Sequence, residues 1–558
     1  MLDDRVRLPS IIWIFVGYVM LFSFTVSSSG RTALASYSGY GPIAQASISF
    51  YALVLFMASV AVFFSSYYGR REMSHQAYVF AIIVLGSTAL LTWNVSLVLT
   101  GQPYFHDTYR NVLWTSLIEN SGSSQALSTF SSYPIEWPGG WVFGAIFQTV
   151  TGLDALQFAL LFPFVFSGMI MVMFLYLARL FFRTRYERFL SFALLIGIGG
   201  AFWESLFSTS ALSTLLMVPL LATLAEKSTT KSTLSLLFAV AIVVVHPVLP
   251  MMLVFGLLSY SIVIVLGRLL GVKKLRPIST RLDLSVTAVL LLATISYLFL
   301  GTTYIGHAFV ETSLRLSGFE PPHLFAVSLP YTPVDIMVPL SRIVFYCVYA
   351  LLLAYFVIFL IRKNSSIGPF RLCLLGSSIL AGSVFVFPIL FPGGAFGGRA
   401  IIIGALVTPI VATGIRFWRK WPGRVLASAL FLIFLAFSIL AISSSASRSV
   451  YMQTFSSLSF AGSRAHGYGV LMDPSYQAAN AMPEGAHRIS WLIDYYDAGL
   501  ISGGHVDTLV FTRDMINTYG DFGHNATMQS LLSLADSRCN LVMSSPFVYL
   551  YMNPSFQA

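Results

Sequence analysis

The sequence has little charge: Asp, Glu, Lys and Arg together make up 10% of its 558 residues, compared with about a quarter in soluble domains. Hydrophobic residues make up 56%, and the mean hydropathy is +0.79. This composition excludes an ordinary soluble protein and predicts a polytopic α-helical membrane protein. Cysteine is also scarce. Cys347, Cys373 and Cys539 are too scattered to predict a disulfide framework or a cysteine metal cluster.

Acidic residues are outnumbered by basic ones, which gives a formal net charge of +10. In a soluble chain this excess would suggest nucleic acid as a partner. Here the basic residues flank apolar runs, where positive charge sets membrane topology. We therefore exclude nucleic acid as a partner and expect the chain to lie in a lipid bilayer.

The apolar runs predict about thirteen transmembrane helices, because each is long enough to cross a bilayer. They lie at roughly 11–28, 48–67, 77–99, 155–179, 189–206, 208–225, 232–247, 249–267, 284–303, 338–361, 372–390, 400–415 and 425–443. We read the first run as an uncleaved helix with the amino terminus in the cytoplasm of a plasma-membrane protein. If the segment 141–152 crossed the membrane, all later loops would change sides and the basic ones would no longer face the cytoplasm. We therefore predict that this segment lies in the outer interface.

Two domains follow from this layout. Residues 1–443 form the multi-span part with an external loop at 101–154, and residues 444–558 form a small extracytoplasmic domain of α/β type. Residues 304–337 and 391–399 also fall outside. Within the multi-span part, the external basic residues are few: Arg31, Arg110, Arg315, Arg342 and Arg399.

The external loop at 101–154 contains most of the candidate chemistry. It includes FHDTYRNVLWTSLIENSG and SSYPIEWPGG, which place Asp107, Arg110, Glu119 and Glu136 between long apolar runs. A loop of this length and polarity between spans is typical of a functional segment. It predicts a site at the membrane surface.

The same motifs carry a family resemblance. An aspartate followed by an aromatic residue, a helical segment ending in Glu-Asn-Ser-Gly, and then Tyr-Pro-x-x-x-Pro before an apolar helix with Thr-Gly at its end resemble the first external loop of GT-C membrane glycosyltransferases. The resemblance covers about residues 101–180. It implies a donor sugar on polyprenyl or dolichyl phosphate and a glycan, lipid or protein acceptor. The chain departs from the family in having more helices before the loop than the one that is typical.

Inverting sugar transfer needs a carboxylate to take a proton from the acceptor hydroxyl and a cation to hold the departing phosphate. The resemblance assigns the first role to Asp107; the alternative is that Asp107 only caps a helix. Arg399 lies near the end of the glycine-rich FPGGAFGGRA, whose amides and following helix start would suit an anion. Arg315 and Arg342 are the next candidates for phosphate. A plain turn or solvated loop explains these arginines equally well.

Further residues are candidates for binding the sugar or the acceptor: His106, Arg110, Glu136, Glu204, Tyr133 and Trp137. An interfacial aromatic belt would explain Tyr133 and Trp137 without function. Buried His246 is expected to be structural. No second acid adjoins Asp107, so no acidic metal pair is evident, and a divalent metal stays open as a cofactor.

Other classes of protein remain alternatives. A transporter or flippase of lipid-linked cargo would be expected to carry charges near the membrane midplane, and the centres of the predicted helices have almost none. A receptor would leave the acidic loop unexplained. A glycan ligase or polymerase shares the lipid-phosphate leaving group and is hard to separate by sequence; the Asp-centred loop favours the monosaccharide-donor enzyme.

Overall fold

The structure of the chain is a computed structural model. It describes residues 4–29, 46–69, 71–100, 107–127, 137–199, 207–225, 229–246, 248–269, 281–300, 395–414, 421–444, 470–471, 508–512, 540–544 and 548–552, with a few single positions besides.

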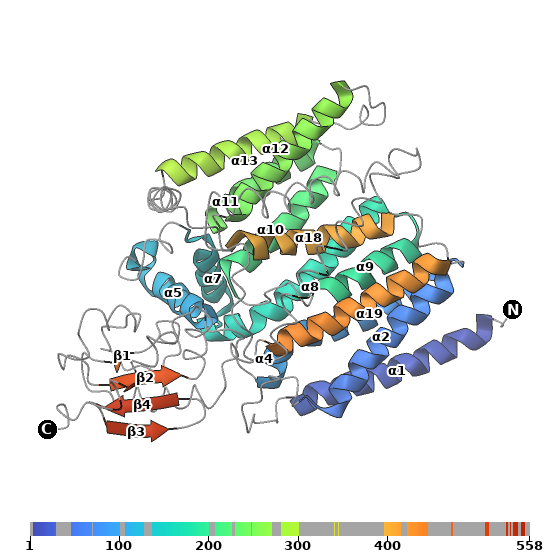
Figure 1. Cartoon of the computed structure of the whole chain (residues 1–558), viewed down its shortest axis with the longest axis horizontal. Coiled ribbons are helices and arrows are strands. Elements are labelled where there is room, and N and C mark those ends of the chain that lie inside the picture. Colours follow the sequence, from blue (N-terminus) through green and yellow to red (C-terminus); the bar gives the residue numbers. More distant parts are fainter. Residues whose placement is uncertain are drawn as a thin grey trace.

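The described chain is mostly helical (Figure 1). Its helices are α1 (Asp4–Ser29), α2 (Ile48–Tyr68), α3 (His75–Trp93), α4 (Val95–Thr100), α5 (Asp107–Ser121), a short 3-10 helix η2 (Ser124–Leu127), α7 (Gly139–Thr151), α8 (Ala155–Phe181), α9 (Arg185–Gly199), α10 (Thr209–Ala225), α11 (Thr229–Val245), α12 (Val248–Leu269), α13 (Arg281–Leu300), α18 (Ala395–Gly414) and α19 (Trp421–Ser444).

The predicted spans agree well with these helices. Each of them except 338–361 and 372–390 overlaps a described helix, and those two lie almost wholly outside the described residues, so the total of about thirteen stays a prediction. Among the described helices, α2, α3, α8 and residues 249–266 of α12 are long and apolar enough to cross a membrane. The span predicted at 77–99 is divided into α3 and α4 at Asn94, whose side-chain amide donates to the carbonyl of Leu90 at 2.8 Å. Asparagine competes in this way with regular helix bonding.

Large apolar side chains point outward from the helix bundle. Exposed examples occur on six helices: Trp13, Leu55, Val172, Leu237, Ile262 and Leu292. Exposed apolar surface on so many helices has a high free-energy cost in water and none in lipid. The bundle is therefore suited to a bilayer, as the composition predicts.

Polar caps explain where several helices begin and end. The side chains of Ser47 and Ser74 accept backbone N–H bonds at the starts of α2 and α3. α7 ends at Gly152, which has a left-handed φ of 72° that glycine adopts without strain. Asp154 and Gln157 then form a reciprocal capping box that starts α8. This turn fixes the angle at which the short α7 joins the long α8.

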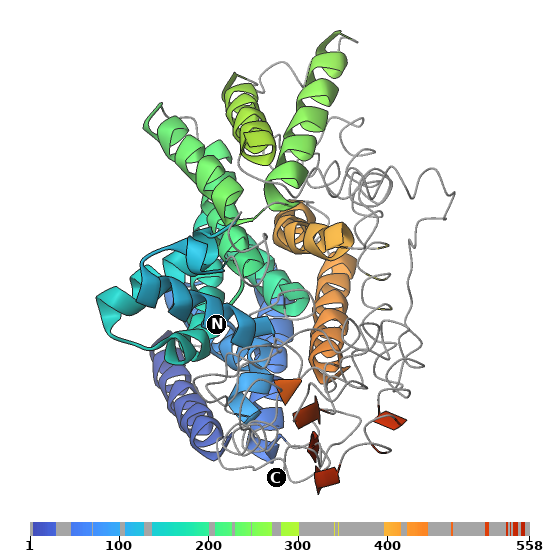
Figure 2. The same ribbon diagram turned by 90° about the vertical axis from the view of Figure 1, so that its left-hand side faces the viewer.

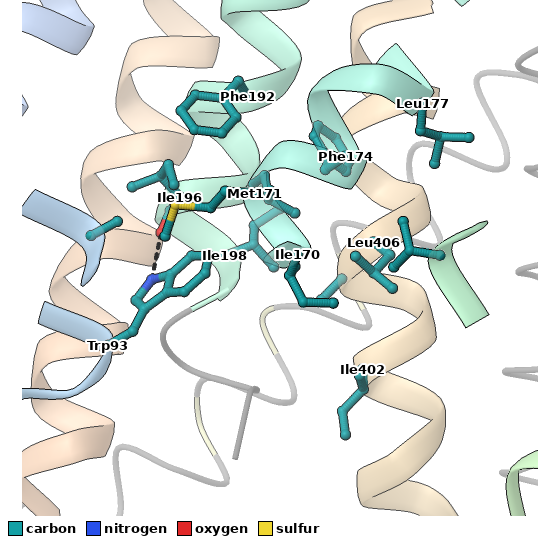
Figure 3. Packing of buried hydrophobic residues seen from close by; sticks show 14 of the residues in the cluster. Trp93, Ile170, Met171, Phe174, Leu177, Phe192, Ile196, Ile198, Ile402 and Leu406 are labelled. Atoms are coloured by element: carbon teal, nitrogen blue, oxygen red, sulfur yellow. Dashed lines mark hydrogen bonds between the residues drawn. The ribbon is translucent and has the colours of Figure 1, made fainter. Parts of the chain in front are cut away.

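The core lies where α3, α8, α9 and α18 pack together (Figure 3). Trp93 at the end of α3 donates its indole N–H to the carbonyl of Ile196 at 3.4 Å. Met171 and Ile196 lie beside the indole, Phe192 lies farther along α9, and Ile402 and Leu406 approach from α18. This hydrogen bond fixes the end of α3 against α9, which sets the position from which the chain continues toward the external loop.

The bundle has two ends of different character (Figure 1). One end, which we name the loop end, carries α5, α7 and the strands. Figure 2 looks onto this end and shows α5 and α7 lying over the bundle. The opposite end, which we name the arginine end, carries the amino terminus, the α2–α3 and α8–α9 turns and the start of α19. Arg185 there donates to the carbonyl of Met73 at 3.3 Å, which joins two of these turns.

The carboxy-terminal segment contributes a four-stranded sheet in the order β1-β2-β4-β3. Its strands are β1 (Val470–Leu471), β2 (Thr508–Thr512), β3 (Asn540–Ser544) and β4 (Val548–Met552). β1 runs parallel to β2, whereas β4 is antiparallel to both β2 and β3. The sequence pattern at 539–554 predicts one strand, but the structure has two, with Pro546 between them because proline cannot continue a ladder. The sequence SYQAANAMPEGAHRISWLIDYYDAG also predicts a helix, a turn and a buried strand, which lie outside the described residues, so the α/β type stays a prediction.

Candidate active site at the loop end

Asp107 is the first residue of α5, which begins at the loop end of the bundle. Arg110 lies in the same first turn, and His106 directly precedes the described helix. The predicted helix start is confirmed. Both proposed roles of Asp107, as a base and as a cap, are compatible with this position, so its catalytic role stays a prediction.

Asn111, one turn beyond Asp107, anchors the start of α5. Its amide nitrogen Nδ2 donates to the carbonyl of Phe207 at 2.8 Å, and its Oδ1 accepts the indole N–H of Trp141 at 3.0 Å. Asn111 is 5% exposed, so these bonds are formed away from water. One side chain therefore ties α5 to α7 and to the chain before α10.

Small residues let these elements approach closely. A Cβ at Gly144 would lie 2.8 Å from Thr115 Cγ2 and 3.0 Å from the Phe207 ring, and one at Gly140 would lie 2.6 Å from Thr209 Cγ2. Beside them the rings of Trp114 and Trp141 meet edge to face with centroids 4.8 Å apart. The helices α5 and α7 are therefore packed closely against the bundle.

Phe207 is the described residue nearest in sequence to Glu204. Glu204 lies three residues before Phe207, which is 1% exposed and held by Asn111. Glu204 itself lies outside the described residues, so its place in the site stays a prediction.

His246 follows α11 and is buried next to the same cluster. Its Nε2 lies 3.0 Å from Ser210 Oγ, and its Nδ1 accepts the backbone N–H of Leu249 at 3.4 Å. A backbone N–H can only donate, so the neutral ring carries its proton on Nε2 and donates to Ser210. In that tautomer His246 cannot take the serine proton. The geometry agrees with the structural role expected for it.

Trp137 is positioned by the structure, but not as an open stacking platform. Its side chain is 1% exposed, and its ring centroid lies 6.2 Å from that of Tyr297 on α13. The next helix, α7, begins two residues later against Val244 and Val245 at the end of α11. A sugar could stack on this indole only after the site opened.

Glu119 lies away from the start of α5. It accepts a hydrogen bond from Gln148 Nε2 at 2.8 Å, which ties the far ends of α5 and α7. Twelve residues of helix separate it from Asp107, about 18 Å along the axis. Glu119 therefore links α5 to α7 and is too far from Asp107 to act together with it.

Arg399 lies in the second turn of α18, which begins at Ala395. The sequence pattern predicts a glycine-rich turn up to residue 398 and a helix from about 400; this boundary was wrong by five residues. Gly397 and Gly398 are helical here because the apolar residues that follow bury the helix in the core, which outweighs the low helix propensity of glycine. The first-turn amides still lack intrahelical acceptors, so an anion role for this helix start stays a prediction.

The remaining candidates, Tyr133, Glu136, Arg315 and Arg342, lie outside the described residues, as does His106. No group of three His, Cys, Asp or Glu side chains in the described part of the chain could hold a metal ion. Sequence reasoning missed Asn111 and Trp141. The available signal was a polar residue one turn after Asp107, flanked by Val112, Leu113 and Trp114.

Comparison with known proteins gives structural likeness only. No protein-family model matches the chain, and no curated protein sequence does. ArnT from Cupriavidus metallidurans bound to undecaprenyl phosphate matches 87% of this chain and 99% of its own, with TM-score 0.49 and 13% identity. The apo state of that ArnT matches 85% of this chain and 98% of its own, with TM-score 0.47 and 13% identity.

The archaeal oligosaccharyltransferase AglB from Archaeoglobus fulgidus, in complex with an inhibitory peptide and a dolichol-phosphate, matches 86% of this chain and 74% of its own, with TM-score 0.46 and 14% identity. Two of these solved structures hold a polyprenyl phosphate. At TM-scores below 0.5, this likeness assigns the chain neither a family nor an activity.

Proposed function

We propose that this chain is a membrane glycosyltransferase that moves a sugar from a polyprenyl-phosphate donor to an acceptor hydroxyl at the outer membrane surface. The observation that carries the proposal is the anchoring of α5 by Asn111, which holds the helix start at Asp107 against the bundle. A base in such a reaction must be held in place relative to the reacting atoms. The motifs of the external loop support the choice of reaction.

In the proposed reaction the Asp107 carboxylate takes the proton of the acceptor hydroxyl. The acceptor oxygen attacks the anomeric carbon from the face opposite the phosphate, and a new C–O bond forms with inversion. The bond from that carbon to the phosphate oxygen breaks, and the polyprenyl phosphate leaves with the electron pair. Arg399, with Arg315 and Arg342 as further candidates, would stabilise the phosphate charge.

The other proposed contacts are to the sugar and the acceptor. His106, Arg110, Glu136 and Glu204 would bind hydroxyl groups, and Tyr133 with Trp137 would stack on the sugar ring. The acceptor is a glycan, a lipid or a protein. We further propose that the site faces outward in the plasma membrane, with the amino terminus in the cytoplasm and residues 444–558 outside.

The test is Asp107→Asn, assayed in membranes with a panel of labelled polyprenyl-phosphate monosaccharides. Asparagine keeps the shape and can still cap a helix, but it cannot accept a proton, so transfer should fall at least about 100-fold. Glu119→Gln is the matched control, because it makes the same change on the same helix far from the proposed base. It should retain activity.

Transfer by Asp107→Asn at the wild-type rate would remove the catalytic assignment. Absence of donor cleavage by the wild type with every donor in the panel would contradict the enzyme itself. Movement of intact donor across the membrane, without cleavage, would instead support the flippase alternative.

A further inference from the structure

Arg424 is a buried cation at the arginine end, far from the proposed active site. It lies in the first turn of α19, and its side chain is 3% exposed. Its Nη1 donates to the carbonyl of Ser66, in the last turn of α2, at 2.7 Å. The close fit extends to Gly69, where a Cβ would lie 2.0 Å from Arg424 Cδ. The structure therefore holds this guanidinium in one orientation.

The other two nitrogens of the guanidinium are not used. Within the described part of the chain, Nε and Nη2 are buried and have no hydrogen-bond acceptor. These two atoms form the edge of the group whose parallel N–H bonds bind an oxyanion in bidentate fashion. A buried charge with unmet donors is costly, and a bidentate oxyanion would satisfy both.

Two neighbouring side chains, Tyr186 and Glu187, do not accept a hydrogen bond from Nε or Nη2 of Arg424. Burial raises the pKa of Tyr186 to about 12, with the charge of Arg424 opposing the rise, so the phenol stays neutral at physiological pH. Its hydroxyl donates to the carbonyl of Ser65 at 3.0 Å. Glu187 accepts a hydrogen bond from Thr184 at 2.9 Å. These two neighbours therefore do not provide the hydrogen-bond acceptor that Nε and Nη2 of Arg424 lack.

The surroundings favour an anion. Arg424 lies at the amino-terminal, positive end of α19, where a cation is disfavoured and an anion is stabilised. Arg183 and Arg185 are exposed in and next to the α8–α9 turn at the same end of the bundle, and Arg71 lies over the ring of Tyr67. Together they produce a positive field that would draw a negative ligand to this end.

We propose that Arg424 is the centre of an anion site at the arginine end that takes a phosphate group. The phosphate could be the headgroup of an anionic lipid in the adjacent leaflet or a free phosphate. Both edge nitrogens are covered in this structure, so a side chain must move to admit the ligand. Trp421 is 57% exposed, lies with its ring 5.4 Å from the guanidinium carbon and begins α19, so it can move at small cost.

The experiment measures binding to the full chain in neutral detergent by calorimetry, with three probes. Dioctanoyl phosphatidic acid offers a lipid phosphate, dioctanoylglycerol offers the same chains without phosphate, and inorganic phosphate offers the anion alone. Arg424→Gln should weaken binding of phosphatidic acid roughly 10- to 100-fold, because a charge-assisted bidentate contact is lost. Arg183→Gln, which removes an exposed charge at the same end, should change binding less than about threefold.

The probes distinguish the two sources. Binding of phosphatidic acid but not of inorganic phosphate would identify a lipid headgroup site, and binding of both would identify a general phosphate site. Arg424→Lys serves if the glutamine variant fails to fold: it keeps the charge but loses the bidentate edge, so binding should weaken about tenfold. Equal affinity in wild type and Arg424→Lys or Arg424→Gln would overturn the proposal, as would equal affinity for dioctanoylglycerol and phosphatidic acid.

Discussion

Asn111 is the residue on which the geometry of the candidate site most depends. It uses both ends of its amide, one on the carbonyl of Phe207 and the other on the indole of Trp141. A buried amide that satisfies a donor and an acceptor at once fixes the distance between three chain segments. We regard Asn111 as a positioning residue, because it acts on the reaction through the placement of Asp107.

Asn111→Ala should lower both stability and transfer. Loss of the amide leaves the Phe207 carbonyl without this donor in a buried site, at a cost of about 1–3 kcal/mol. Activity should fall mainly in kcat, because the base is displaced rather than removed. The measurements are thermal unfolding and the split between kcat and KM, with Asn120→Ala, an exposed change on the same helix, as the control. An unchanged kcat in a destabilised Asn111→Ala protein would show that Asn111 has a structural role only.

At the scale of elements, the close approach of α5, α7 and the chain before α10 sets the shape of the loop end. α7 has thirteen residues, about 20 Å of helix, which is shorter than the roughly 30 Å hydrocarbon core. Its length therefore favours the predicted interfacial position over a full crossing. The glycines of α7 face neighbouring segments of the same chain, where a larger residue would not fit.

Gly144→Ala tests this approach. The added methyl would lie 2.8 Å from Thr115 and 3.0 Å from Phe207, so α5 and α7 must separate slightly, at a cost of about 1–3 kcal/mol. Gly168→Ala is the matched control within α8, because its nearest neighbour, a methyl of Leu90, is 4.0 Å away. The unfolding midpoint should fall in the first variant and stay level or rise in the second. A fall of the same size in both variants would mean that the close contact is not responsible.

At the scale of the whole molecule, the division into a loop end and an arginine end gives a simple prediction of topology. Ser123 follows α5, and Leu541 lies on β3; both are exposed and belong to segments predicted to be external. Glu72 is exposed in the α2–α3 turn at the other end. The excess of basic residues in that turn predicts that it faces the cytoplasm.

Cysteine labelling with a membrane-impermeant reagent measures this directly. In a background without the three native cysteines, Ser123→Cys and Leu541→Cys should react in intact cells, and Glu72→Cys should react only after lysis. Labelling of Ser123→Cys from outside together with protection of Leu541→Cys would mean that the number of crossings between them is odd. The predicted interfacial position of 141–152 would then be the first to revise.

The sequence by itself determined the membrane class, the positions of most spans and the start of α5, because these depend on local composition, helix length and capping. It did not predict the division of the third span at Asn94, the early start of α18 or the second strand beside Pro546. The early start of α18 depends on the core into which it packs, whereas Asn94 and Pro546 act locally and were signals already present in the sequence.

Only the tertiary structure decided which polar residues of the external loop belong together. Asp107 and Glu119 are alike in sequence, yet one begins α5 at the Asn111 anchor and the other ties α5 to Gln148 at the far end of both helices. Likewise Arg424 reads as one more basic residue in a turn, and only the packing of α2 against α19 shows that it is buried. Sequence fixes the chemical groups, whereas burial and hydrogen-bond partners depend on contacts between residues as far apart as Ser66 and Arg424.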